Sequence, residues 1–185
     1  MKSVGRGLGM EMGARCLREL PDYLRPGLRL VFVGFNPSEY SCRAGHYYAS
    51  PGNPFWSFLY EAGLVPERLS PQDDYRLLEF GIGITDIVKR CSRSSSDLGG
   101  EDYRLGAPML REKLERAAPK TVAFNGKGVW EKFTGRPSKL GPQQGAAGGA
   151  RVFVLPSTSR RNARLTHEQK LDYFRTLADW VSTDA

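Results

Sequence analysis

The feature that most constrains the fold of this chain is a set of four short runs of aliphatic, aromatic and β-branched residues. They lie at residues 30–33, 82–88, 121–124 and 152–155. Each run is nearly continuous in apolar character and does not alternate with polar residues, which is typical of strands buried on both faces of a parallel sheet. The runs therefore predict a mostly parallel sheet.

Helical patterns separate the predicted strands. The first begins at Asn53, a capping residue followed by Pro54, and ends at Gly63. Further helices are predicted over residues 109–118 and 128–133. Strands that alternate with helices predict a three-layer α/β/α sandwich with a short, mostly parallel central sheet.

The last predicted helix begins after Thr166, where Gln169 completes a capping box. The glycine-rich segment 140–150 before it is interpreted as a surface loop. We interpret residues 1–14 as a flexible N-terminal tail and residues 15–185 as a single domain, because a chain of 185 residues fits one compact core.

Cysteine and histidine usage suggests neither a disulfide framework nor a metal site. Cys16, Cys42 and Cys91 are odd in number, widely spaced and without a CxxC pair, which favours reduced cysteines in the cytoplasm. His46 and His167 have no metal-ligand spacing, so we expect no metal. No apolar run approaches the roughly 20 residues that span a bilayer, and no membrane partner is expected.

The charge of the chain favours a polyanionic partner. Twenty-seven lysines and arginines against 20 acidic residues give a net charge of +7. Six of the basic residues form clusters in two short segments, which raises the expectation of nucleic acid as the partner. The clusters are Arg160, Arg161 and Arg164, and Lys89, Arg90 and Arg93.

Polar side chains follow the predicted strands at the points where they end. These residues are Asn36, Asp86, Asn125 and Ser157. Ligands of open α/β sheets bind outside the carboxyl ends of the strands, so four polar residues at that edge indicate a site there. The neighbouring glycines complete neither a phosphate-binding P-loop nor a dinucleotide-binding GxGxxG motif, which argues against a nucleotide cofactor.

Five segments occur along the chain in the order GFNPS, GHYYASPGNPFW, GIGITDIVKR, TVAFNGK and LPSTSRRNAR. Together they resemble the motifs of the mismatch-specific uracil and thymine DNA glycosylases of the uracil-DNA glycosylase superfamily. The resemblance covers roughly residues 28 to 180. It implies a fold like the sandwich predicted above and an enzyme that flips a damaged base out of the duplex and cleaves its N-glycosidic bond.

The resemblance assigns roles around the base. Asn36 matches the catalytic asparagine, whose amide can hold a water near the sugar C1′ atom. Tyr48 matches the aromatic residue that stacks on the extruded base, with Tyr47 and Phe35 as neighbours that can share this role. Asn53 and Ser157 are expected to line the base pocket, although Asn53 serves equally well as a helix cap.

The loop from Ser157 to Ala163 is expected to enter the minor groove. Arg161 matches the wedge that fills the gap left by the flipped nucleotide. The alternative is that the arginines of this loop bind only phosphates, as most protein contacts to DNA do. Further DNA contacts are expected from Arg160, Asn162, Arg164, Lys89 and Arg93.

Asp86 departs from the family pattern, which commonly has Asn or Lys at this place. A carboxylate can accept a proton from water or offset the positive charge of an oxocarbenium-like sugar. We therefore hypothesise that Asp86 is catalytic together with Asn36. The alternative is a surface ion pair between Asp86 and Lys89 or Arg90.

The resemblance predicts a monofunctional glycosylase that excises uracil and related damaged bases from double-stranded DNA, with a preference for G:U mismatches. We expect a cytoplasmic monomer, nucleoid-associated if bacterial, that needs no cofactor. One alternative is a non-catalytic damaged-DNA-binding domain with the same fold, and another is a small-nucleotide hydrolase. The serine-rich segment 92–100 is interpreted as a mobile loop beside the site.

Overall fold

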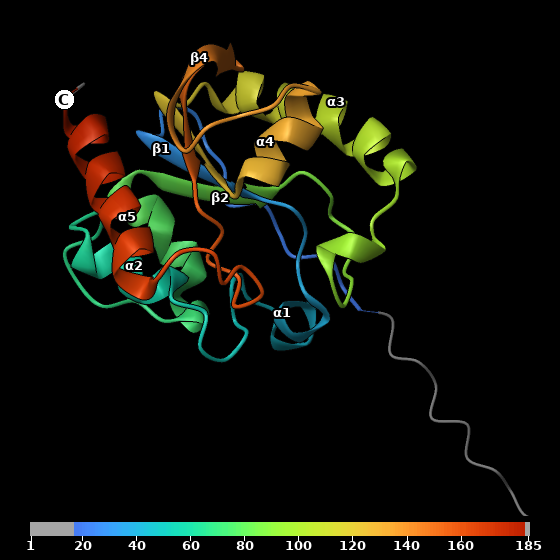
Figure 1. Ribbon diagram of the computed structural model, residues 1–185, viewed down its shortest axis with the longest axis horizontal. Coiled ribbons are helices and arrows are strands. Elements are labelled where there is room, and N and C mark those ends of the chain that lie inside the picture. Colours follow the sequence, from blue (N-terminus) through green and yellow to red (C-terminus); the bar gives the residue numbers. More distant parts are fainter. Residues whose placement is uncertain (1–16, 184–185) are drawn as a thin grey trace, which may run out of the picture.

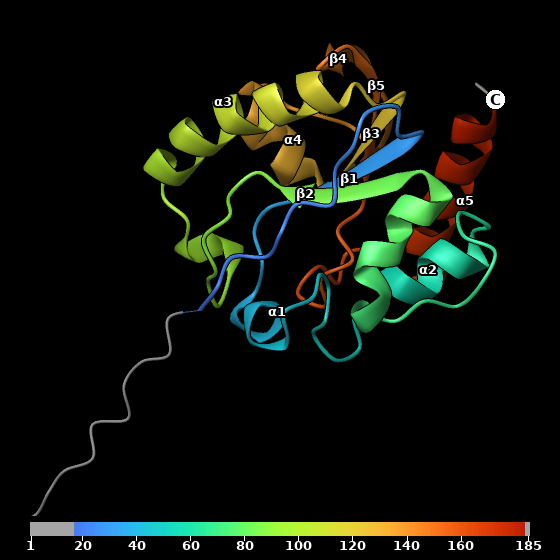
Figure 2. The ribbon, with the colours of Figure 1, turned by 180° about the vertical axis from the view of Figure 1, so that it is seen from behind.

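The computed structural model describes residues 17–183 and is built on a five-stranded sheet of order β2-β1-β3-β5-β4 (Figures 1 and 2). The four parallel strands are β1 (Leu30–Gly34), β2 (Ile82–Asp86), β3 (Thr121–Asn125) and β5 (Ala150–Leu155). They confirm the four predicted runs. Every residue of β1, β2 and β3 is buried, which explains why their sequences are apolar without alternation.

Helices cover both faces of the sheet and confirm the three-layer sandwich (Figures 1 and 2). On one face lie α2 (Phe55–Glu61), the 3₁₀-helix η1 (Pro71–Phe80) and α5 (His167–Ser182). On the other lie α3 (Gly100–Ala117) and α4 (Lys127–Thr134). A short helix, α1 (Glu39–Ala44), follows β1. No helix within residues 17–183 is long and apolar enough to cross a membrane.

Two aromatic clusters fill the layers between sheet and helices. On the α5 side, the ring of Phe55 packs edge-on against Phe32 of β1 with ring centroids 5.1 Å apart. On the α4 side, Phe124 of β3 packs against Trp130 with centroids 5.0 Å apart. Large buried rings of this kind contribute strongly to core stability, and they hold the strand ends in fixed positions.

The helix boundaries confirm some predictions and correct others. Thr166 and Gln169 form the predicted capping box, with the backbone N–H of each donating to the side chain of the other. In contrast, the helix predicted to begin at residue 109 is longer than predicted. The helix α3 begins at Gly100 and continues through Pro108, which lies inside it and does not interrupt it. The short helices α1 and η1 were not predicted from the sequence.

The segment 140–150, predicted to be a surface loop, forms most of an edge hairpin. Its strand β4 (Gly141–Ala147) pairs antiparallel with β5. The sequence GPQQGAA lacks β-branched residues, so its pairing with β5 and not its propensity makes it a strand. The hairpin turns at Gly148 and Gly149, with φ of 59° and 83°. A Cβ at Gly148 would lie 2.7 Å from the Leu114 backbone, so the turn packs tightly on α3.

Cys42 and Cys91 form a disulfide, with Cα atoms 6.4 Å apart, and this corrects the prediction of reduced cysteines. The bond joins α1 to the segment after β2, across 49 positions of sequence. The pairing depends on how α1 packs against that segment, which the cysteine spacing does not reveal. Cys16 and the predicted tail 1–14 lie outside the described residues.

Candidate active site

A cavity of about 540 Å³ opens at the carboxyl ends of β1, β2 and β3, where the sequence predicted a site. Most of the predicted site residues line it. They are Phe35, Asn36, Tyr48, Asn53, Asp86, Arg93, Ser157, Arg160, Arg161 and Asn162. Lys89 and Arg164 are not among the residues that line the cavity.

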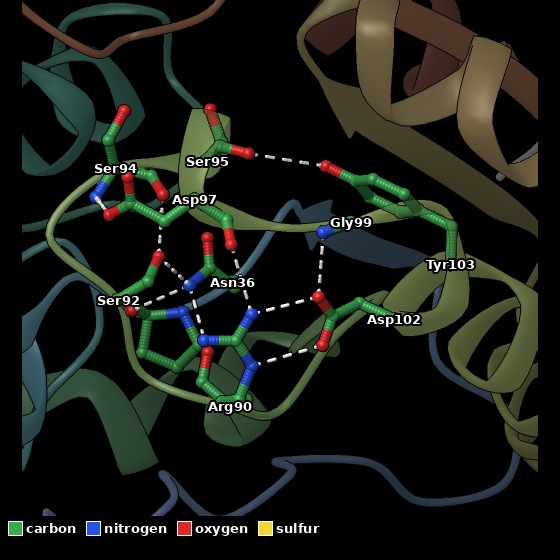
Figure 3. A network of polar contacts seen from close by, with 10 residues as sticks. Asn36, Arg90, Ser92, Ser94, Ser95, Asp97, Gly99, Asp102 and Tyr103 are labelled. Carbon is green, nitrogen blue, oxygen red and sulfur yellow. Dashed lines mark hydrogen bonds and ion pairs between the residues drawn. The ribbon is translucent and has the colours of Figure 1, made fainter.

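Asn36 lies just beyond the end of β1, and its amide nitrogen faces the segment after β2 (Figure 3). Nδ2 donates to the Arg90 carbonyl at 2.8 Å, the Ser92 hydroxyl at 2.8 Å and the Pro37 carbonyl at 3.1 Å. Two of these partners can only accept, so the nitrogen must be the atom that faces them. The Asn36 carbonyl oxygen is therefore the group left to bind water or a ligand.

The segment that holds Asn36 is itself fixed by an ion pair (Figure 3). The Arg90 guanidinium donates to both carboxylate oxygens of Asp102, at 3.0 and 2.8 Å. Asp102 also accepts from the backbone N–H of Gly99 at 2.8 Å. The segment predicted to be a mobile loop thus contains a short 3₁₀-helix, η2 (Ser95–Asp97), and a hydrogen-bonded wall of the cavity.

Asp86 is the last residue of β2 and lines the cavity with only 4% of its surface exposed. Its Oδ2 atom is buried and has no hydrogen-bond partner in the described part of the chain. Burial raises the pKa of Asp86 to about 7, although the positive charge of Lys89 opposes the shift. A carboxyl group with this pKa can exchange a proton near neutral pH.

Asp86 does not form the surface ion pair considered as the alternative. Lys89 pairs with Asp22 at 2.7 Å and donates to the Tyr47 hydroxyl at 2.9 Å. Its side chain is only 14% exposed, which leaves little of it to reach DNA. Asp22 also pairs with Lys113 at 2.6 Å. This network was not predicted from the sequence, because Asp22 lies outside every motif that carries the family resemblance.

An aromatic wall closes one side of the cavity. Tyr48 has a left-handed φ of 51° and stacks on Phe55 with ring centroids 4.0 Å apart. Phe35 meets Gly128 of α4, where a Cβ atom would lie 2.8 Å from the Phe35 ring. Asn53 lines the cavity and accepts a hydrogen bond from the backbone N–H of Phe55 at 3.1 Å, although Pro54 and not Asn53 is the N-cap residue of α2.

The loop after β5 is anchored by two hydrogen bonds between Asn125 and Thr158. The Asn125 amide donates to the Thr158 hydroxyl at 2.9 Å and accepts from the Thr158 N–H at 3.1 Å. Beyond this anchor, Arg160 and Arg161 are exposed at the rim of the cavity. The sequence placed Asn125 at a strand end, but nothing in it indicated Thr158 as the partner.

No cluster of three or more His, Cys, Asp or Glu side chains that could hold a metal ion occurs within residues 17–183. The cavity brings together an amide carbonyl, a carboxyl group of raised pKa and an aromatic wall, beside two exposed arginines. This set can bind a flat ring, orient a water molecule and contact phosphate.

Comparisons with known proteins identify the family of the chain and a similar fold. Residues 21–181 match the family model of the Uracil DNA glycosylase superfamily. The fold is similar to a solution NMR structure titled a "putative Uracil DNA glycosylase" from Methanosarcina acetivorans, with a TM-score of 0.58 and 24% identity. That match covers 87% of this chain and 98% of the other.

Proposed function

The chain belongs to the uracil DNA glycosylase superfamily, and on this premise we propose that it is a monofunctional DNA glycosylase that removes uracil from double-stranded DNA. Uracil opposite guanine is the preferred target. Flipping a nucleotide out of the stack costs a few kcal/mol, and a mispaired base costs least. The proposed enzyme acts as a monomer and leaves an abasic site.

The flipped base enters the cavity and stacks on the Tyr48 ring. The packing of Tyr48 on Phe55 supports this role, because it holds the Tyr48 ring in place as a flat wall of the cavity. The cavity of about 540 Å³ is larger than a pyrimidine ring, which leaves room for the sugar and its phosphate. Related damaged bases of similar size fit the same space.

The chemical step uses a water molecule held by the Asn36 carbonyl oxygen. The water oxygen bonds to the sugar C1′ atom while the bond from C1′ to the base nitrogen breaks, and the base leaves with the electron pair. Asp86 takes the proton of the water and, while ionised, stabilises the positive charge that develops on the sugar. An asparagine amide performs neither task as well as a carboxylate, because it carries no negative charge and is not a base near neutral pH.

Arg161 serves as the wedge that fills the space left by the flipped nucleotide, and Arg160 and Arg93 bind backbone phosphates. The exposure of Arg160 and Arg161 at the rim of the cavity supports these roles. Each phosphate neutralised releases counterions, so DNA binding should weaken steeply as salt is raised. Lys89 is not included, since its ammonium group is held by Asp22.

The observation that carries this proposal is the convergence of Asn36 and Asp86 on one cavity beside Tyr48, where Oδ2 of the buried Asp86 carboxyl has no hydrogen-bond partner within residues 17–183. The test is an end-labelled duplex with one uracil opposite guanine or adenine, incubated in EDTA and then treated with alkali. We expect alkali-dependent strand breaks, more from G:U than from A:U, and release of free uracil. An intact strand at enzyme excess would favour a non-catalytic damaged-DNA-binding domain.

A further inference from the structure

The turn of residues 46–49, here called the stacking turn, has a backbone that tyrosine rarely adopts. Tyr48 has φ of 51°, and the only other non-glycine residue with positive φ within residues 17–183 is Ala118. A left-handed backbone costs roughly 1–2 kcal/mol for a residue with a side chain. Such a conformation persists only where the surroundings fix it.

Hydrogen bonds fix the stacking turn from several sides. The backbone N–H of Tyr47 donates to Asp74 Oδ2 at 3.0 Å, and the Tyr47 carbonyl accepts from the Trp56 indole at 3.1 Å. On the other side of Tyr48, the backbone N–H of Ala49 donates to the Ser41 hydroxyl at 3.3 Å. Tyr48 is therefore held by bonds to the residues on both sides of it.

Asp74 is the unexpected member of this set, because it is completely buried. It comes from η1, which contributes no residue to the cavity lining. Its Oδ1 lies 3.2 Å from Nδ1 of His46, the first residue of the stacking turn. A carboxylate is costly to bury unless it is paired and hydrogen-bonded. Here both oxygens of Asp74 are used on adjacent residues of one turn.

We propose that Asp74 is a positioning residue that presets Tyr48 for stacking on the extruded base. This inference rests on the proposed function, in which Tyr48 receives the base. Asp74 touches neither base nor sugar. It fixes His46 and Tyr47, so that the Tyr48 ring remains on Phe55 and the wall exists before the base arrives. Binding of the extruded base then does not include the free-energy cost of ordering the stacking turn.

A double-mutant cycle tests whether Asp74 acts through Tyr48. The rate of single-turnover excision of uracil from a G:U duplex is measured for four enzymes. The effect of Asp74→Asn is determined once in the wild-type background and once in the Tyr48→Ala background. We expect Asp74→Asn to slow wild type by about tenfold. In the Tyr48→Ala background the same change should cost less than about twofold, because the ring that it positions is absent. An equal loss in both backgrounds, or no loss in either, overturns the proposal.

Asp73→Asn is the matched control, since it makes the same chemical change on the same helix. Asp73 accepts hydrogen bonds from Ser70 and lies away from the cavity lining, so this variant should keep the wild-type rate. If Asp74→Asn fails to fold, Trp56→Phe replaces it in the cycle, because it removes the indole N–H that holds the Tyr47 carbonyl while keeping an aromatic ring edge-on to Phe55. The same dependence on Tyr48 is expected.

A crystal structure of Asp74→Asn, or of Trp56→Phe in its place, gives a readout that needs no activity. The proposal predicts that Tyr48 leaves the left-handed region or that its ring leaves Phe55. An unaltered turn overturns the proposal whatever the rates. If wild type excises no uracil, the proposed function fails and the inference about the base fails with it, whereas the structure still decides whether Asp74 holds the turn.

Discussion

Gly34 and Asp86 are register partners at the carboxyl ends of β1 and β2, and a Cβ atom on Gly34 would lie 2.3 Å from Oδ1 of Asp86. The same Cβ atom would lie 3.0 Å from the hydroxyl of Tyr48. Glycine is therefore needed at position 34 because a side chain has no room there. Its backbone does not require glycine, since it is not left-handed. Its missing side chain lets the carboxyl group and the aromatic wall meet at the bottom of the cavity.

Gly34→Ala should displace the Asp86 carboxyl and lower the excision rate by more than about tenfold, with a stability loss of roughly 1–3 kcal/mol from overpacking. Single-turnover kinetics and thermal melting measure the two effects. Gly100→Ala is the control, because a Cβ atom there meets nothing within 4 Å. A Gly34→Ala enzyme with the full wild-type rate would contradict the placement of Asp86 in the reaction.

The excision rate should depend on the ionisation of Asp86. Since burial raises the pKa of Asp86 to about 7, the active carboxylate is lost as the pH falls below that value. The single-turnover rate should then decline about tenfold per pH unit. Asp86→Asn should have a low excision rate that does not decline in this way as the pH falls. A wild-type profile that is flat between pH 5 and 8, with roughly the rate of Asp86→Asn, would exclude Asp86 as the base.

The same shift predicts that Asp86 weakens the fold at high pH. The folded state binds the Asp86 proton more tightly than the unfolded state, whose pKa is near 3.8, so stability falls as the pH rises from about 4 to about 7. Asp86→Asn cannot ionise and should be more stable than wild type at pH 8, by roughly 1 kcal/mol or more. The difference should shrink at pH 5. Thermal melts across pH measure it, and a less stable variant at pH 8 would contradict the account.

Reduction of the disulfide between Cys42 and Cys91 should destabilise the protein. A bond that closes a loop of 49 positions typically contributes about 2–4 kcal/mol. Denaturant unfolding with and without a dithiol reductant measures the loss. The excision rate should fall as well, because Cys91 adjoins Arg90 and Ser92, which hold Asn36. The Cys42→Ser/Cys91→Ser variant should not respond to reductant, and a reductant effect of equal size there would show that the disulfide is not its cause.

The parallel sheet and the carboxyl-edge site were predictable because they depend on local sequence. Buried strands need continuous apolar runs, and Asn36 and Asp86 follow such runs directly. The helix α5 was predictable for the same reason, since Thr166 and Gln169 carry its start signal within four residues.

The features that were missed depend on contacts between distant residues. Strand β4 forms only because β5 offers an edge, and the partners of Lys89 and Asn125 come from segments far away in sequence. The disulfide likewise joins two segments that the fold brings together. A single sequence carries no record of such pairs, so neither the network around Asp22 nor the role of Asp74 was visible in it.

The most direct test of the account separates binding from chemistry at Asn36. The affinity of Asn36→Ala is measured on a G:U duplex whose target sugar carries a 2′-fluoro group that blocks cleavage. The single-turnover rate of the same variant is measured on the normal duplex. Ser92→Ala is the matched control, since it removes one anchoring hydrogen bond of Asn36 but leaves its carbonyl oxygen in place.

We predict that Asn36→Ala binds the fluorinated duplex within about threefold of wild type but loses at least about a hundredfold in rate, as expected when an orienting group for the attacking water is removed. Ser92→Ala should keep most of the rate. An Asn36→Ala enzyme that cleaves at the wild-type rate, or a loss in rate that is matched by an equal loss in affinity, would contradict the claim that this residue holds the attacking water.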